Sequence, residues 1–245
     1  MLPRANGHEP RVAFPGAPGA FGEAAVIKAW EGTALPVPAT SFASVLSLLS
    51  ASRVDYGVLP LWNTSIGAVR AAYDALDAFD ETVETVGEIN VPVSLCVLTL
   101  PGVAFSEVRV LGSHPTAFAQ CTQFFAAHPR LVQCDASDSA GAARDLALLA
   151  ARAPLGEADM IAPPWYANAV YDGPSELAVV AGHAAATRYG LEVLAEDIQN
   201  ELRNVTRFSI LQARQHARTG EPGLRSPLAR DGHQRDRPRS IGRQG

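Results

Sequence analysis

The feature that most constrains the fold is an alternation of short β-rich runs with Ala/Leu-rich helical stretches over residues 11–212. Such an alternation is typical of helices packed on a mostly parallel sheet. Strands are predicted at 11–14 and 56–59, and each is followed by a loop and a helix. The same order of strand, loop and helix starts again near Val108. The pattern therefore predicts an α/β protein.

The second set of elements mirrors the first, so the chain is predicted to form two α/β lobes around a central cleft. Two crossover segments, near residues 88–100 and 191–208, would join the lobes. A long strand is predicted at 91–100 and a last strand at 208–211. In open α/β sheets ligands bind in the crevice at the carboxyl ends of the strands. The cleft is expected to collect the loops that follow residues 14, 60, 112 and 204.

The composition of the chain changes at its C-terminal end, after residue 212. We expect residues 11–90 plus 191–212 to form lobe 1, residues 91–190 to form lobe 2, and residues 213–245 to form a disordered basic tail. The tail holds eight arginines against three acids, and the whole chain has a net charge of −5, so residues 1–212 carry −10. This balance removes the electrostatic case for nucleic-acid binding, and an anionic ligand would need a local basic pocket.

The cysteines and the hydropathy pattern bear on location. Cys96, Cys121 and Cys134 are an odd number with neither CxxC nor zinc-knuckle spacing, so we expect free thiols in a reducing, cytoplasmic compartment. No stretch approaches the roughly 18–20 uninterrupted apolar residues of a membrane span, and the N-terminus has no apolar run of signal-peptide length. We therefore expect no membrane partner.

Common cofactor and nucleophile motifs are missing from the chain. The segment PGAPGAFG lacks GxGxxG spacing, and no GxxxxGK[ST], HExxH or GxSxG motif occurs. The histidines and cysteines show no metal-ligand spacing, so we expect neither a cofactor nor a metal. Three polar clusters remain at predicted loops: Asn63-Thr64-Ser65, Ser113-His114-Pro115-Thr116 with Gln120, and Asn204-Val205-Thr206-Arg207-Phe208.

Each polar cluster alone has a structural explanation, because Asn63 and Ser113 could cap helices and Thr206 could be an ordinary strand residue. Together the clusters supply hydroxyl and amide donors with one guanidinium and no strong base. Such a set suits an anionic substrate and a reaction driven by positioning and leaving-group protonation.

Five ordered blocks then give a family resemblance. RVAFPGAPGAFGEAA, DYGVLPLWNTSIGAV, SHPTAFAQC, YGLEVL and NVTRF follow one another within residues 11–212 and together resemble the catalytic domain of prephenate dehydratase. The resemblance implies two α/β lobes similar to type II periplasmic binding proteins. It also implies a cofactor-free carbon–oxygen lyase of phenylalanine biosynthesis, which converts prephenate to phenylpyruvate with loss of CO2 and water. Arogenate stays open as a second substrate, and the family suggests a homodimer.

The resemblance also implies roles for residues at matching motif positions. Thr206 would hydrogen-bond or protonate the leaving hydroxyl, and Arg207 would bind a substrate carboxylate, ideally through two hydrogen bonds. The other candidates would bind substrate as neutral donors around its ring and side chain: Asn63, Thr64, Ser65, Ser113 and Gln120.

Departures from the family motifs keep two alternatives open. Ala20 and Gly22 lack the hydroxyls of the first motif, Trp62 replaces an acid, and Thr116 replaces a glutamine. One alternative is an enzyme of secondary metabolism that decarboxylates prephenate without aromatising it, although we expect such enzymes to lack the Thr-Arg pair of NVTRF. The other is a non-catalytic protein that binds small anions on the same fold.

Two further segments differ from the family pattern. Residues 153–174 form an insertion, which we expect to be a surface excursion. Many family members continue into a regulatory domain that binds phenylalanine, and the composition of residues 213–245 cannot form one. We therefore expect no feedback by phenylalanine through such a domain.

Overall fold

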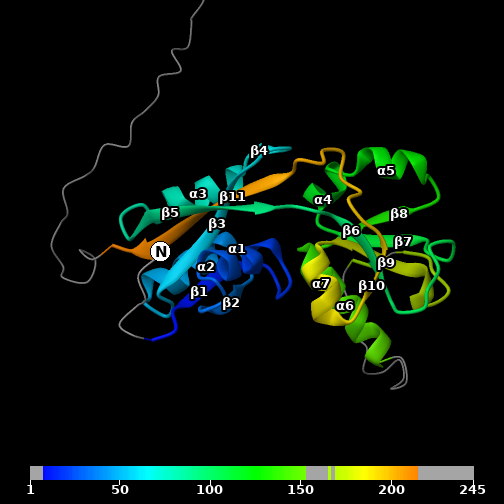
Figure 1. Ribbon diagram of the computed structural model, residues 1–245, viewed down its shortest axis with the longest axis horizontal. Helices are drawn as coiled ribbons and strands as arrows, with labels where there is room; N and C mark the ends of the chain where they lie inside the picture. The colour runs from blue at the N-terminus through cyan, green and yellow to red at the C-terminus, as the bar shows by residue number, and fades with distance from the viewer. Residues whose placement is uncertain (1–7, 153–164, 167–168, 215–245) are drawn as a thin grey trace, which may run out of the picture. The chain divides into compact units, whose positions relative to one another are not determined.

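The computed structural model describes residues 8–152, 165–166 and 169–214. In this part of the chain, helices pack on two β-sheets of six and five strands (Figure 1). The described residues belong to one unit, Met1–Arg214. Most of the predicted insertion and the predicted tail from residue 215 on lie outside the described residues.

The first sheet has the order β2-β1-β3-β11-β5, with β4 paired to β3 (Figure 1). Its parallel part, β2-β1-β3, comes from consecutive strands separated by helices, as the alternating pattern predicts. By contrast, β11 lies antiparallel between β3 and β5. The strands are β1 (Arg11–Pro15), β2 (Leu35–Ala39), β3 (Tyr56–Asn63), β4 (Gly67–Ala68), β5 (Val83–Pro92) and β11 (Val205–Ala213).

Helices cover both faces of the first sheet because successive strand residues point to opposite sides. Phe14 of β1 lies in one buried cluster with Val26 of α1, whereas Ala13 lies in another with Leu46 of α2. The side chain of Ser41 caps α2 by accepting a hydrogen bond from the backbone of its first turn. The helices on this sheet are α1 (Phe21–Ala29), α2 (Phe42–Ser50) and α3 (Arg70–Asp77).

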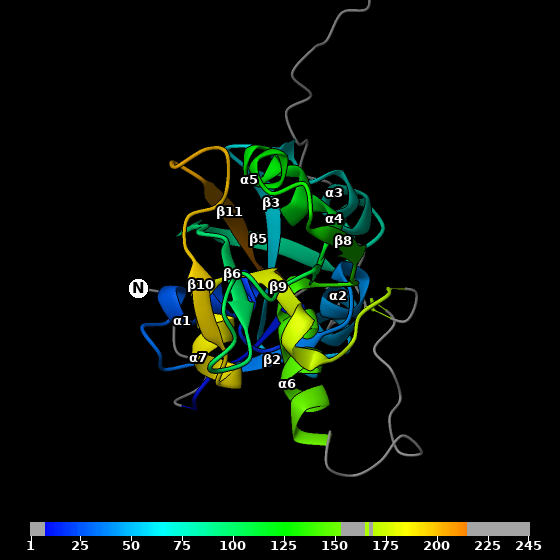
Figure 2. The same cartoon turned by 90° about the vertical axis from the view of Figure 1, so that its right-hand side faces the viewer.

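The second sheet has the order β10-β6-β9-β7-β8. Here β7 is parallel to β8 and β9, and β6 is antiparallel to β9 and β10. One buried cluster joins α4 and α5 to the sheet, and another joins α6 and α7 to it (Figure 2). The strands are β6 (Cys96–Thr99), β7 (Val110–Ser113), β8 (Val132–Asp135), β9 (Leu177–Ala181) and β10 (Glu192–Ala195). The helices are α4 (Pro115–Ala119), α5 (Thr122–Ala127), α6 (Ser139–Arg152), the 3-10 turn η2 (Pro174–Glu176) and α7 (His183–Tyr189).

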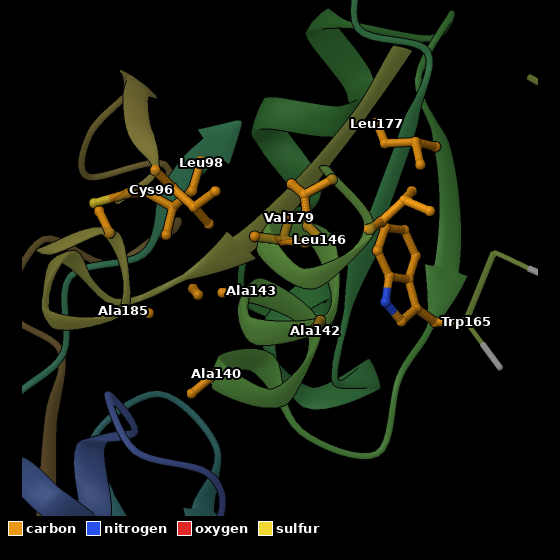
Figure 3. Close-up of a cluster of buried hydrophobic side chains, with 14 of the residues drawn as sticks. Cys96, Leu98, Ala140, Ala142, Ala143, Leu146, Trp165, Leu177, Val179 and Ala185 are labelled. Carbon is orange, nitrogen blue, oxygen red and sulfur yellow. The ribbon is translucent and has the colours of Figure 1, made fainter. Parts of the chain in front are cut away.

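The prediction of a surface excursion after α6 is wrong for the two aromatic residues of it that the structure describes. Trp165 and Tyr166 are only 4% and 2% exposed, and both belong to the core that includes residues of α6. Figure 3 shows Trp165 in this core. Trp165 lies directly on β7, because a Cβ atom added at Gly112 would come within 2.3 Å of the Trp165 ring. The absence of a side chain at Gly112 thus provides the space for the indole.

The two α/β lobes are confirmed, but three boundaries differ from the sequence prediction. β10, which we expected in lobe 1, pairs with β6 of the second sheet. The run 91–100 is not one strand, because residues 93–95 hydrogen-bond to the returning crossover, for example from Val93 N to Asn204 O at 2.8 Å. Ala213 ends β11 rather than starting the tail, and Arg214 N donates to Thr82 O at 2.9 Å.

Candidate active site

The ends of β3 and β11 bring two of the predicted polar clusters together. Asn63 is the last residue of β3, and Thr206 is the second residue of β11. The strands are antiparallel neighbours, and their register places Asn63 opposite Thr206. Both side chains are buried, with 3% and 8% exposure. Residues 143 positions apart in the sequence therefore share one polar site.

Asn63 uses its whole hydrogen-bonding capacity within this site. Its Nδ2 donates to Asn204 Oδ1 at 2.7 Å and to Thr206 Oγ1 at 2.9 Å. Its Oδ1 accepts from the backbone nitrogens of Ser65 and Ile66 at 2.8 and 3.2 Å. An asparagine amide has two N–H hydrogens and two acceptor positions, so none remains for a ligand. The geometry makes Asn63 the residue that orients Thr206.

Thr206, in contrast, keeps a proton to donate. A threonine hydroxyl has one hydrogen and two lone pairs, and the Asn63 amide occupies one lone pair. Among the described residues, no acceptor receives the Thr206 hydroxyl hydrogen. The hydrogen bond from Asn63 restricts the positions open to this hydroxyl hydrogen and leaves it available to an oxygen atom placed against it.

The network continues from the first sheet to the second. Asn204 Nδ2 donates to Gln120 Oε1 at 2.7 Å, and Gln120 Nε2 donates to Thr116 O at 3.0 Å. Gln120 O also accepts from Asn200 N at 2.6 Å. The predicted residue Gln120 therefore joins Asn63 and Thr206 through Asn204. From the sequence alone, Asn204 belongs to a polar cluster but has no role assigned to it. Asn204 and Thr206 are two residues apart, so an extended chain points both side chains to the same face.

Thr64 and Ser65 differ in what they leave free. Thr64 Oγ1 donates to Arg203 O at 3.0 Å and accepts from Val205 N at 2.9 Å, so it fastens the start of β11. No described residue accepts a hydrogen bond from the Ser65 hydroxyl. Ser65 and Gln120 lie on a small cavity of about 170 Å³, with a lining completed by Ile66, Ala119, Asn200 and Glu201.

Ser113 lies outside this network. It ends β7 in the second sheet, and it is fully buried. Its Oγ donates to Val180 O at 2.5 Å and lies 2.9 Å from Ser139 Oγ, which leaves its hydroxyl hydrogen committed to the neighbouring strand. The structure thus gives Ser113 the role of a connector between β7, β9 and the start of α6.

Arg207 lies on the opposite face of the first sheet from Thr206. The register pairs it with Trp62, the neighbour of Asn63, and adjacent strand residues point to opposite faces. The guanidinium carbon of Arg207 lies 5.8 Å from the centre of the Trp62 ring. Its Nε is 3.8 Å from Glu88 Oε2. The two residues assigned to catalysis are therefore adjacent in sequence but separated by the sheet.

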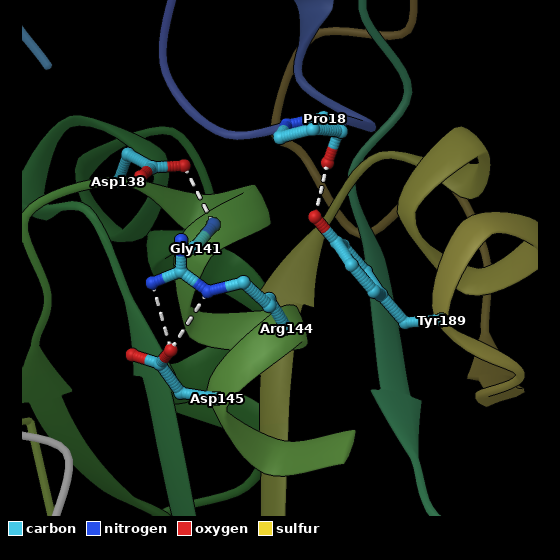
Figure 4. A network of polar contacts seen from close by, with 6 residues as sticks. All are labelled: Pro18, Asp138, Gly141, Arg144, Asp145 and Tyr189. Carbon is cyan, nitrogen blue, oxygen red and sulfur yellow. Dashed lines mark hydrogen bonds and ion pairs between the residues drawn. The ribbon is translucent and has the colours of Figure 1, made fainter. Parts of the chain in front are cut away.

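The glycine-rich loop after β1 is held against the second sheet. Tyr189 Oη donates to Pro18 O at 2.6 Å, while Asp138 Oδ1 accepts from Gly141 N at 2.6 Å at the start of α6 (Figure 4). Gly19 has a φ of +89°, which favours glycine, and a Cβ there would lie 3.0 Å from the Ala185 Cα. The loop therefore meets the N-terminal part of α7 closely.

One of the departures from the family motifs, Gly22, has a local structural reason. Nothing in the structure explains Ala20, which precedes α1 without a capping side chain. At Gly22, an added Cβ would lie 3.0 Å from Pro15 O, so this glycine allows α1 to pack closely on β1.

Over the described ranges, no group of three or more His, Cys, Asp or Glu side chains could hold a metal ion. Nor is any helix of this part long and apolar enough to cross a membrane.

The two sheets and the buried amide–hydroxyl network define a bilobal α/β protein with a polar site where its lobes are joined. The family model for prephenate dehydratase matches residues 12–216, and the chain belongs to this family. It is 35% identical over 207 residues to arogenate dehydratase 1 of Petunia hybrida, a match that covers 84% of this chain and 43% of that protein. The chain spans less than half the length of the curated plant relatives it matches.

Solved structures give the same fold. A prephenate dehydratase from Arthrobacter aurescens in complex with L-Phe is similar with a TM-score of 0.65 and 27% identity, over 89% of this chain and 63% of the other. A protein described as a novel type of quorum quenching acylase, GqqA, is similar with a TM-score of 0.63 and 26% identity, over 89% of this chain and 67% of the other. Family membership is thus shown, and the five sequence blocks identify it correctly.

Proposed function

We propose that this chain is a prephenate dehydratase, which converts prephenate to phenylpyruvate, CO2 and water. The observation that carries the proposal is the buried Thr206 hydroxyl, whose lone pair is held by Asn63 at 2.9 Å and whose proton has no acceptor among the described residues. Family membership and the named activities of similar proteins support it.

The proposed reaction needs a proton at the departing oxygen. The bond from the ring carbon to its carboxylate breaks and releases CO2, and its electron pair enters the ring as the bond to the hydroxyl breaks. Hydroxide is a poor leaving group, so Thr206 would donate a hydrogen bond to it and transfer a proton that solvent then replaces, so that water leaves. Threonine is a weak acid, and most of its effect would come from a fixed donor at developing negative charge. Aromatisation supplies the driving force.

The remaining site residues would act around this donor. Asn63 would orient Thr206, and Asn204 with Gln120 would hold the network across the join of the lobes. Ser65, with its hydroxyl unused among the described residues, would be a neutral donor to the substrate. Relatives are named for arogenate as well as prephenate, so arogenate is the second substrate to be measured.

Product analysis tests the proposal. Purified protein is incubated with prephenate or with arogenate at neutral pH, and the products are identified by chromatography and mass spectrometry. We expect phenylpyruvate from prephenate above the uncatalysed blank. Thr206→Ala should lower kcat by about 10² or more while the protein stays folded, and Thr206→Ser should recover part of the activity.

Other outcomes would replace this proposal. A decarboxylated product that is not aromatic would favour the decarboxylase alternative, and tight binding of prephenate without turnover would favour an anion-binding protein. An N-acyl amide is tested as a further substrate in the same assay, because the chain is similar to the acylase GqqA. Equal activity of Thr206→Ala and the unchanged protein would exclude Thr206 as the proton donor.

A further inference from the structure

Arg207 and Trp62 form a pair directly behind the Asn63–Thr206 pair. β3 and β11 place Trp62 opposite Arg207 and Asn63 opposite Thr206, so the two cross-strand pairs are consecutive and face opposite sides of the sheet. The guanidinium lies over the indole at 5.8 Å, and both residues remain partly open to solvent. This contact lies on the face away from the Thr206 hydroxyl.

The ladder between β3 and β11 is weakened just beside these pairs. The register shifts between Arg207 and Phe208, so that Phe208 lies opposite Pro60 and Leu61 has no partner on β11. Pro60 has no N–H group to donate to β11. The carbonyl of Leu61 instead accepts from Val69 N at 2.9 Å. Backbone pairing between β3 and β11 is therefore interrupted just beside the end that carries Asn63 and Thr206, and β11 keeps unbroken pairing there only with β5.

The Arg207 side chain lies beside this interruption and approaches side chains of both strands that flank β11. Besides Trp62 on β3, it approaches Glu88 on β5, with 3.8 Å between Nε and Oε2. The Nε of Arg207 has no hydrogen-bond partner among the described residues, so stacking and charge, rather than a hydrogen bond, set its position. A planar cation that touches both neighbours of β11 is suited to keep the three strand ends in register.

We propose that Trp62 and Arg207 act together as positioning residues, which hold the end of β11 so that Thr206 stays at hydrogen-bonding distance from Asn63. This inference rests on the proposed role of Thr206. It assigns Arg207 a role behind the sheet instead of direct contact with a substrate carboxylate. It also explains why a tryptophan is compatible with the position directly before Asn63. The Trp62 ring lies on the face of the sheet away from the site.

Kinetics of Trp62→Ala, Arg207→Gln and the double variant test the pair. We expect each single variant to lower kcat about tenfold with KM changed less than threefold. The double variant should lose no more than the worse single variant, because either change breaks the same contact. Arg207→Lys should recover little, since an ammonium keeps the charge without the planar stack, whereas Trp62→Phe should recover most of the activity.

Two matched controls come from α3, on the same lobe. Arg70→Gln removes an exposed arginine, and Tyr73→Ala removes an aromatic side chain that is 38% exposed, as Trp62 is. Both should leave kcat and KM unchanged. If Arg207→Gln raises KM more than tenfold at unchanged kcat while Trp62→Ala has no effect, Arg207 binds substrate directly and the proposal is wrong. Losses that multiply in the double variant would contradict it as well.

Amide hydrogen exchange separates this inference from the proposed function. In Trp62→Ala and Arg207→Gln, the amides of Val205 and Thr206 should exchange at least tenfold faster than in the unchanged protein, and those of β9 should not change. Unchanged exchange at Val205 and Thr206 would overturn the positioning role. If the unchanged protein has no dehydratase activity, the proposed function fails, and the exchange result still decides whether the pair holds this strand end.

Discussion

Residues of the site differ in how much hydrogen-bonding capacity they leave for a ligand, and this difference separates their roles. Asn63 and Thr64 have no free donor, whereas Thr206 and Ser65 keep a hydroxyl hydrogen for which no described residue is the acceptor. A side chain with no free donor can only orient its neighbours. We therefore separate the amide that positions from the hydroxyl that donates, although both belong to one motif-derived set.

Asn63→Asp tests the positioning amide. The change keeps the size of the side chain but removes both Nδ2 donors, and it places a carboxylate against the oxygens Asn204 Oδ1 and Thr206 Oγ1. We expect kcat to fall by about 10² and the free energy of unfolding to fall by about 1–3 kcal/mol. Steady-state kinetics and urea unfolding measure the two effects. Gln123→Glu, an amide-to-acid change at an exposed position of α5, should alter neither quantity.

At the residue scale, the sequence predicted which types of side chain gather but not the faces on which they lie. The resemblance placed Thr206 and Arg207 in one catalytic group, because it assigns roles by motif position and not by the face of a strand. The strand begins at Val205, and alternation then sends these two neighbours to opposite faces. The sequence therefore identified both side chains but not that they lie on opposite faces of the sheet.

Among the elements, β7 depends on a contact that its own sequence does not reveal. Gly112 is read locally as a weak strand residue, yet its missing side chain is the space that Trp165 fills. The two residues are 53 positions apart, and pairing at that distance cannot be read from periodicity. Parallel strands and helices with clear apolar patterns, such as β1 with α1, were predictable because their signal is local.

Gly112→Ala tests this contact. The added Cβ would lie 2.3 Å from the Trp165 ring, so either the indole or β7 must move. We expect the free energy of unfolding to fall by about 1–3 kcal/mol, as for other overpacked cores. In the Trp165→Ala background the same change should cost much less, because the ring is gone. Urea unfolding of the four proteins measures the coupling, and equal costs in both backgrounds would show that Trp165 does not occupy this space.

For the molecule as a whole, two lobes were predictable because two sets of strands and helices repeat along the chain. The way in which the lobes join was less predictable, since the segments 93–95 and 198–204 hold each other by backbone hydrogen bonds, which leave no signal in the sequence. Asn204 belongs to this join and also to the site network. The segment that connects the two lobes therefore also forms part of the candidate site. This explains why both the connection and the site depend on residues far apart in the sequence.

Buried thiols and phenols set an alkaline limit on the stability of the whole fold. Burial raises the pKa of Cys121 from 9.0 to about 12. Burial is also the main cause of the raised pKa values of Cys96, Cys134, Tyr56 and Tyr189. Each group keeps its proton to a higher pH in the folded state than in the unfolded state. Its stabilisation is therefore complete below its unfolded pKa and is lost as the pH rises through the folded value.

The free energy of unfolding should accordingly fall as the pH rises above about 9, where the unfolded thiols begin to ionise. Urea unfolding from neutral pH into the alkaline range measures this decline. Cys121→Ala removes the most strongly shifted of these groups, so its curve should start lower, because a buried side chain is shortened, but decline less steeply. Cys134→Ala removes a thiol that is only partly buried and should change the slope less. If the slopes of the unchanged protein and Cys121→Ala are the same, the thiol of Cys121 ionises as readily in the fold as in the unfolded chain, and the packing around it is looser than the structure shows.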